Sequence, residues 1–167
     1  MEKELIIDDK FKLVRLKDDD KDYKDLEKWY KEKEVNTYFE QREMSFEEIK
    51  NKYQERTKEN AKVPVYMINY ENNNIGIIQY SRKDQDTLEI DIFIGEANLL
   101  SKGIGSKVVT FFSNYLLKQC KKVIMCPLKD NIRAIKCYEK SGFKIIKEFE
   151  EKDTIGNNQV YLLMEKE

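Results

Sequence analysis

The chain has 167 residues, and its 31 Lys and Arg nearly balance its 32 Asp and Glu, so the net charge of -1 gives no reason to expect a nucleic acid or an anionic membrane as partner. Hydrophobic residues make up 40% of the chain, enough for a core, and the length predicts one domain over residues 1–167. The absence of histidine excludes Ser-His-Asp and Cys-His machinery and every His-ligated metal site.

Hydrophobic periodicity predicts a series of strands and helices along the chain. The strands are expected at 11–16, 63–70, 75–82, 87–95, 121–127, 143–149 and 157–165. The helices are expected at 22–35, from a Ser45–Glu48 capping box through Tyr53, along the apolar stripe Val108–Leu116, and from Asp130 or Asn131 to Gly142 at C′. The order β-α-α-β-β-β-α-β-α-β-β indicates an α/β domain with a mixed sheet.

The strand at 87–95 carries carboxylates on one of its faces. Glu89 and Asp91 alternate with isoleucines, so they point away from the apolar face. Two carboxylates on one face raise one another's pKa, as burial does, and this makes Asp91 the best candidate for a general base. The alternative is that Asp91 lies on a solvated strand face.

Two glycines open the helix that follows this strand. The run Gly103-Ile104-Gly105-Ser106-Lys107 would place free N–H groups and the positive end of a helix dipole beside bare backbone, which favours a phosphate. The spacing matches neither the P-loop nor the dinucleotide fingerprint, because Val108 stands where the latter needs a third glycine. Glycines that only serve a turn are the alternative.

Cysteine usage and the chain ends bear on the compartment. The three cysteines, Cys120, Cys126 and Cys137, have no CxxC spacing and are interpreted as reduced thiols. No apolar stretch approaches the ~20 residues that span a bilayer, and the first ten residues have no signal-peptide core. These features together predict a cytoplasmic protein.

Two segments, 91–109 (DIFIGEANLLSKGIGSKVV) and 126–144 (CPLKDNIRAIKCYEKSGFK), resemble the GNAT N-acetyltransferases, most closely the aminoglycoside 6′-N-acetyltransferase branch. The family's signature Q/R-x-x-G-x-G/A is matched at 100–105, with Leu100 in place of Gln or Arg. The pattern N-x-x-A-x-x-x-Y-x-K-x-G-F is complete from Asn131 to Phe143. The resemblance implies a GNAT-like mixed, splayed central sheet flanked by helices.

The resemblance also implies acetyl-CoA as cosubstrate and no metal. Backbone N–H groups of Lys102 to Lys107 would bind its pyrophosphate, the strand 92–94 would pair with the pantetheine arm, and Asn131 would contact the arm from the other side. The residues expected to bind acetyl-CoA are Ile92, Phe93, Ile94, Ser101, Lys102, Gly103, Ile104, Gly105, Ser106, Lys107, Asn131 and Ala134.

By the same resemblance, Asp91 is the base and Tyr138 the general acid for the CoA thiolate, although Tyr138 is also in phase for core packing. The acceptor would be a cationic small-molecule amine, such as an aminoglycoside 6′-amine, which would attack directly in a ternary complex with the enzyme and acetyl-CoA. The enzyme would be a monomer or a homodimer. The residues expected to bind it are Tyr38, Phe39, Gln79, Glu89, Asp91 and Asp153. The alternatives are a protein or peptide N-acetyltransferase and an inactive acetyl-CoA-binding module.

Overall fold

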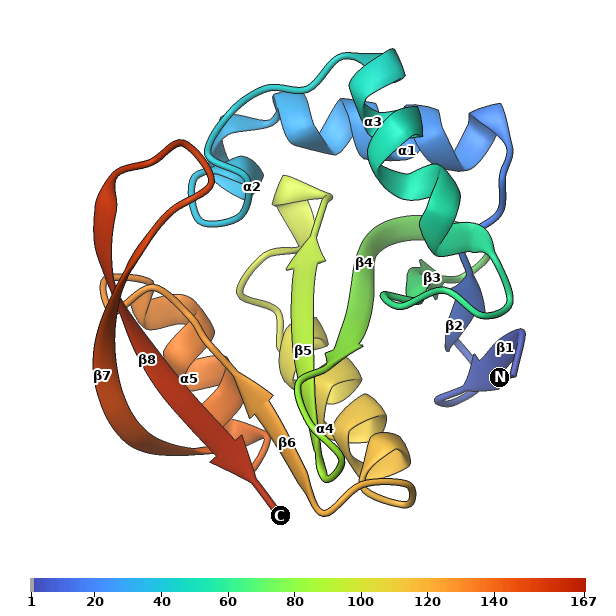
Figure 1. Cartoon of the computed structure of the whole chain (residues 1–167). Helices are drawn as coiled ribbons and strands as arrows, with labels where there is room; N and C mark the ends of the chain where they lie inside the picture. The colour runs from blue at the N-terminus through green and yellow to red at the C-terminus, as the bar shows by residue number, and fades with distance from the viewer. Residues whose placement is uncertain (1) are drawn as a thin grey trace. The chain divides into compact units, whose positions relative to one another are not determined.

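The structure is a computed structural model that describes residues 2–167 (Figure 1). The chain forms two compact units. The first comprises the described residues up to Ser81 together with Ile92–Leu100, and the second comprises Arg82–Asp91 and Ser101–Glu167. Strand β5 (Thr87–Ile94) begins in the second unit and ends in the first.

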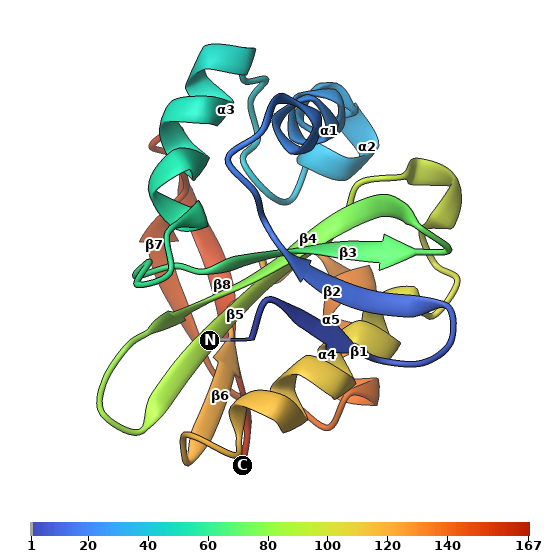
Figure 2. The same cartoon turned by 90° about the vertical axis from the view of Figure 1, so that its right-hand side faces the viewer.

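The first unit contains four antiparallel strands in the order β1-β2-β3-β4 and a group of helices. Its strands are β1 (Glu4–Ile6), β2 (Phe11–Arg15), β3 (Val65–Tyr70) and β4 (Asn73–Arg82). Its helices are α1 (Asp20–Lys31), α2 (Lys33–Asn36), α3 (Phe46–Tyr53) and the short 3₁₀ turns Gln54–Thr57 and Ala97–Leu99. Figure 2 shows α1, α2 and α3 together on one side of strands β2 to β4.

Short-range side-chain signals set the ends of these elements. Asp19 caps α1 by accepting a hydrogen bond from Asp22 N at 2.9 Å. The predicted capping box is confirmed, because Ser45 accepts from Glu48 N and the Glu48 carboxylate accepts from Ser45 N. The β3–β4 hairpin turns at Glu71, whose φ of 47° lies in the left-handed region, as does that of the next residue.

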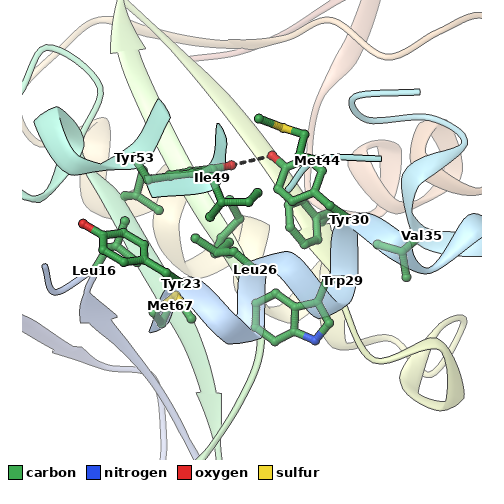
Figure 3. Close-up of a cluster of buried hydrophobic side chains, with 13 residues drawn as sticks. Leu16, Tyr23, Leu26, Trp29, Tyr30, Val35, Met44, Ile49, Tyr53 and Met67 are labelled. Carbon is green, nitrogen blue, oxygen red and sulfur yellow. Dashed lines mark hydrogen bonds between the residues drawn. The ribbon is translucent and has the colours of Figure 1, made fainter. Parts of the chain in front are cut away.

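The core of the first unit is a cluster of aromatic and aliphatic side chains that α1 and α3 bury against the strands (Figure 3). Trp29 and Tyr30 of α1 and Tyr53 of α3 are almost completely buried in it. The Tyr30 and Tyr53 hydroxyls share a hydrogen bond of 2.6 Å, which satisfies both polar groups inside the cluster. Phe93, near the end of β5, belongs to the same cluster.

The second unit is a mixed α/β unit. The start of β5 pairs in parallel with β6 (Lys122–Met125) over Thr87–Glu89, β6 pairs antiparallel with β8 (Asn158–Lys166), and β8 pairs antiparallel with β7 (Lys144–Lys152). Two helices complete it, α4 (Ile104–Leu116) and α5 (Ile132–Lys140). The buried face of α4 consists of Val108, Val109, Phe112, Ser113 and Leu116.

The predicted fold class, element order and mixed sheet are confirmed, with two additions. Strand β1 was not predicted, since three residues are too few to show a period. The predicted helix at 22–35 is divided, because Glu32 has an extended backbone (ψ 106°) that ends α1 before α2 begins. Within residues 2–167, no helix combines the length and hydropathy needed to cross a membrane.

Candidate active site

The first turn of α4 presents backbone donors. Gly103 is its N-cap in the left-handed conformation (φ 78°), and Ser101 two residues earlier also has a positive φ, of 61°. The first hydrogen bond of the helix runs from Lys107 N to Gly103 O at 3.1 Å. The N–H groups of Ile104, Gly105 and Ser106 therefore precede it, at the positive end of the helix dipole.

Different physical constraints explain why each of the two positions in this turn is a glycine. A Cβ added to Gly103 would meet nothing within 4 Å, so its backbone faces open space, and its positive φ disfavours other residues. A Cβ added to Gly105 would lie 3.1 Å from Cys137 Sγ. Gly105 thus allows α4 to approach α5 closely, a packing role that the sequence did not indicate.

Hydrogen bonds join the start of α4 to the last turn of α5. Ser106 Oγ donates to Cys137 O at 3.3 Å, and Ser141 Oγ donates to Ser106 O at 3.2 Å. Asn131 is the N-cap of α5, as predicted, and its side-chain oxygen accepts from Ala134 N at 3.2 Å. The predicted cofactor residues of the second unit, from Ser101 to Lys107 with Asn131 and Ala134, therefore belong to two helix starts in one compact unit.

The carboxylates of β5 lie in different surroundings. Asp91 is exposed between the buried Ile90 and the partly buried Ile92. Glu89 is partly buried and forms an ion pair with Lys83, whose pKa is raised by this hydrogen bond and charge. The two carboxylates of this face therefore differ in exposure, Glu89 being partly buried and Asp91 exposed.

The thiols near these carboxylates are poor nucleophiles. Burial raises the pKa of the Cys126 thiol to about 12, and the charge of Glu89 and a hydrogen bond with it add to the effect. Burial also raises the pKa of the Cys137 thiol, against a lowering contribution from Ser106. Neither thiol is a thiolate near neutral pH.

Tyr138 of α5 is buried beside this region, with its ring centroid 6.4 Å from that of Phe143. Burial raises the pKa of its phenol, and the charge of Asp91 raises it further. Tyr138 therefore keeps its proton at neutral pH and senses the charge of Asp91.

The end of β5 lies in the first unit. Gly95 N donates to Ile75 O at 2.7 Å, and a Cβ added to Gly76 would lie 2.3 Å from Phe93 O. A Cβ added to Gly95 would collide with the Trp29 ring at 2.2 Å. Close packing on a strand and on an aromatic ring therefore fixes the backbone course of Ile92–Ile94, the segment predicted to pair with the pantetheine arm.

The predicted acceptor residues are placed separately. In the first unit, Tyr38 is exposed, Phe39 packs edge-on against Phe93 at 4.6 Å, and buried Gln79 accepts a hydrogen bond from Arg56 Nη1 at 2.8 Å. In the second unit, the Asp153 carboxylate organises the β7–β8 turn. It accepts from the backbone N–H groups of Ile155 and Asn157 and from the side chain of Gln159.

Sequence reasoning missed two lysines that contact these groups. Lys83 pairs with Glu89, and its backbone N–H donates to Thr87 O across the β4–β5 turn. The short connection of residues 83–86 between the two predicted strands is the local signal that could have suggested this. Lys52 of α3 pairs with Glu40 among aromatic rings. Nothing in the local pattern around Lys52 indicates that contact.

Comparison with known proteins identifies the family of this chain. The family model described as acetyltransferase (GNAT) domain matches residues 18–151. Over 57 residues, 33% of this chain, the sequence is 39% identical to the aminoglycoside N(6′)-acetyltransferase type 1 of Klebsiella pneumoniae, and the match spans 28% of that protein. The chain therefore matches less than a third of that relative's length.

Two solved structures share the fold over nearly the whole chain. The aminoglycoside acetyltransferase AAC(6′)-Ib, in complex with coenzyme A and kanamycin, is 22% identical, with 92% of this chain and 93% of that chain covered and a TM-score of 0.75. Spermidine N-acetyltransferase from Vibrio cholerae, in complex with CoA and spermine, is 19% identical, with 95% of this chain and 96% of that chain covered and a TM-score of 0.79. Because the family model covers most of its residues, the chain belongs to the GNAT family of acetyltransferases.

Proposed function

We propose that this chain transfers the acetyl group of acetyl-CoA to a primary amine of a cationic small molecule, with an aminoglycoside 6′-amine as the preferred acceptor. Membership of the acetyltransferase family supports the reaction type. The sequence match to an aminoglycoside N(6′)-acetyltransferase supports the acceptor class. The single observation that carries the proposal is the open first turn of α4.

That turn fits a diphosphate. The N–H groups of Ile104, Gly105 and Ser106 precede the first helical hydrogen bond, and Gly103 adds bare backbone with open space before it. A diphosphate has the negative charge and the acceptor oxygens that such a turn favours. The residues from Ser101 to Lys107 would hold the pyrophosphate of acetyl-CoA.

Bound acetyl-CoA supplies a thioester whose C–S bond breaks as the amine nitrogen forms the new C–N bond. An acceptor ammonium with a pKa of ~10 is almost wholly charged at neutral pH, so a group of the protein must accept its proton. We assign this task to Asp91, and its exposure on β5 supports the assignment, since an acceptor can reach it from solvent. Its negative charge also attracts a cationic acceptor.

Tyr138 would protonate the departing thiolate. Its phenol carries a proton at neutral pH, since burial and the charge of Asp91 raise its pKa and make it a weak acid. The proton released by the amine would restore the phenol after it protonates the thiolate. The amine would attack directly, without an acetylated cysteine, since the raised pKa values of Cys126 and Cys137 leave almost no thiolate to take up the acetyl group.

The test is CoA release from acetyl-CoA with kanamycin, spermidine and an N-terminal peptide as acceptors. We expect turnover with kanamycin and a fall in kcat/KM of ~10²–10⁴-fold for Asp91→Asn, with acetyl-CoA binding retained. The matched control is Asp86→Asn, which removes an exposed carboxylate paired with Lys121 and should leave kcat/KM unchanged. Full activity of Asp91→Asn would refute the base, and release with the peptide alone would refute the acceptor class.

A further inference from the structure

The Lys52 ammonium of α3 lies among three aromatic rings of the first unit. Its Nζ is 5.5 Å from the ring centroid of Tyr30, 5.7 Å from that of Tyr53 and 6.0 Å from that of Phe39. Each distance is within the range in which a cation is attracted to an aromatic face. We call these three rings, together with Glu40, the aromatic cage.

A carboxylate completes the aromatic cage. Glu40 forms an ion pair with Lys52, and the side chains of Lys52 and Glu40 are only 19% and 14% exposed. Two groups so largely removed from water attract one another strongly, because solvent screens them little. The cage thus provides both the aromatic faces and the negative charge that an alkylammonium ion needs.

The position of Glu40 is fixed by a buried asparagine. Asn36 accepts a hydrogen bond from Glu40 N at 3.0 Å through its side-chain oxygen, and its side-chain nitrogen donates to the carbonyl groups of Tyr30 and Arg42. Gln41, with a φ of 62°, also donates from its backbone to Asn36 O. The segment that carries Glu40 is therefore held in place by an amide that is itself buried.

Stability alone does not account for a lysine at this position. A half-buried ion pair gives little net stability compared with apolar side chains of similar size, because both charges lose hydration. The neighbouring residues Met44 and Ile49 show that this cluster accepts aliphatic side chains. A charged residue among these rings is better explained by the chemistry of the site than by packing.

We propose that the aromatic cage is a recognition site for a primary alkylammonium group of the acceptor, and that Lys52 is its built-in occupant in the absence of ligand. This rests on the proposed function for its physiological ligand, a polycationic amine, but the binding chemistry stands on the cage alone. An acceptor ammonium and the Lys52 ammonium compete for Glu40 and the three rings. Lys52 therefore sets the affinity for polycations.

The first experiment removes the Lys52 ammonium by mutation and supplies an alkylammonium ion in solution in its place. Lys52→Ala removes three methylene groups and the ammonium, which together match n-propylammonium. We expect n-propylammonium chloride at ten times its dissociation constant to raise the Tm of this variant by ~4 °C. We expect 1-propanol, which has the same shape without the charge, to raise it by less than a quarter of that, at matched ionic strength.

Matched variants isolate the cage. Lys58→Ala removes a lysine that is also paired with a glutamate, Glu55, but is exposed to solvent, and it should show no difference between n-propylammonium and 1-propanol. Glu40→Gln combined with Lys52→Ala should abolish the preference for the cation. Equal Tm shifts with n-propylammonium and 1-propanol in Lys52→Ala would overturn the proposal.

A second variant covers the case in which Lys52→Ala does not fold. Lys52→Met keeps a side chain that is shorter by only the terminal ammonium, and removes the charge. The KM for spermidine or kanamycin should therefore fall about tenfold, with the KM for acetyl-CoA unchanged. An unchanged or higher acceptor KM would overturn the proposal. The proposed alkylammonium site and the proposed function are tested separately. Because the Tm experiment needs no turnover, absence of acetyl transfer refutes only the proposed function.

Discussion

The Cys126 thiol gives a stability test of the electrostatics around β5. Its pKa is raised to about 12 by burial and by Glu89, whereas a thiol in an unfolded chain has a pKa of ~8.5. The folded state therefore holds this proton to a higher pH than the unfolded state does. The resulting stabilisation is complete below pH ~8.5 and is lost as the pH rises toward the folded-state pKa.

The size of this loss follows from the two pKa values. Between pH 7.5 and 10, a fully shielded thiol would lose ~2 kcal/mol of unfolding free energy. Because Cys126 is only partly buried, we reduce the expectation to ~1 kcal/mol. Urea unfolding at both pH values, for the wild type and Cys126→Ser, measures the difference, because the other titrating groups are shared. Glu89→Gln should lower the thiol pKa and shrink the loss.

Alkylation gives an independent measurement of the same pKa. In a Cys120→Ser/Cys137→Ser background, iodoacetamide at pH 7.5 should modify Cys126 ~10³-fold more slowly than an exposed model thiol, and faster after Glu89→Gln. Equal pH dependence of unfolding in the wild type and Cys126→Ser would refute the reasoning. Alkylation of Cys126 at the rate of an exposed thiol would also refute the reasoning. That result would support acetyl transfer through an acetylated cysteine instead of direct attack.

Three further predictions concern glycines. Gly105→Ala should raise the unfolding free energy by ~1 kcal/mol in a Cys137→Ala background but little in the wild type, because there the new Cβ meets Cys137 Sγ at 3.1 Å. Urea unfolding of the wild type, the two single variants and the double variant measures this coupling. Gly103→Ala should cost ~1 kcal/mol by the same assay, because φ is 78°. Gly95→Ala should cost at least ~2 kcal/mol, and Trp29→Leu should recover part of it, since the added Cβ overlaps that ring.

Local signals in the sequence determined the ends of several elements. The Ser45–Glu48 capping box, the Asn131 cap and the left-handed Gly142 each depend on residues a few positions apart, so the same physics acts in any fold that contains them. Alternation along 87–95 likewise placed Asp91 on the face opposite Ile90. These features were predictable because their partners are neighbours in the chain.

One local signal was interpreted differently from what the structure gives. Asp153 was expected to provide negative charge for the acceptor, yet its carboxylate accepts hydrogen bonds from Ile155, Asn157 and Gln159 in the β7–β8 turn. The sequence Asp-Thr-Ile-Gly-Asn is typical of such a turn, in which an aspartate bonds to the backbone two residues on. Its role as an acceptor contact stays a prediction.

Only the tertiary structure decided which side chains meet across the chain. Hydrophobic period assigns a residue to a face but says nothing of its partner, so Gly105 against Cys137 and Lys52 among aromatic rings were not visible in the sequence. Pairing with a lysine also separated Glu89 from the exposed Asp91, although the two carboxylates share one face. Burial and charge pairing depend on distances that folding creates, and those distances decide which group can accept a proton.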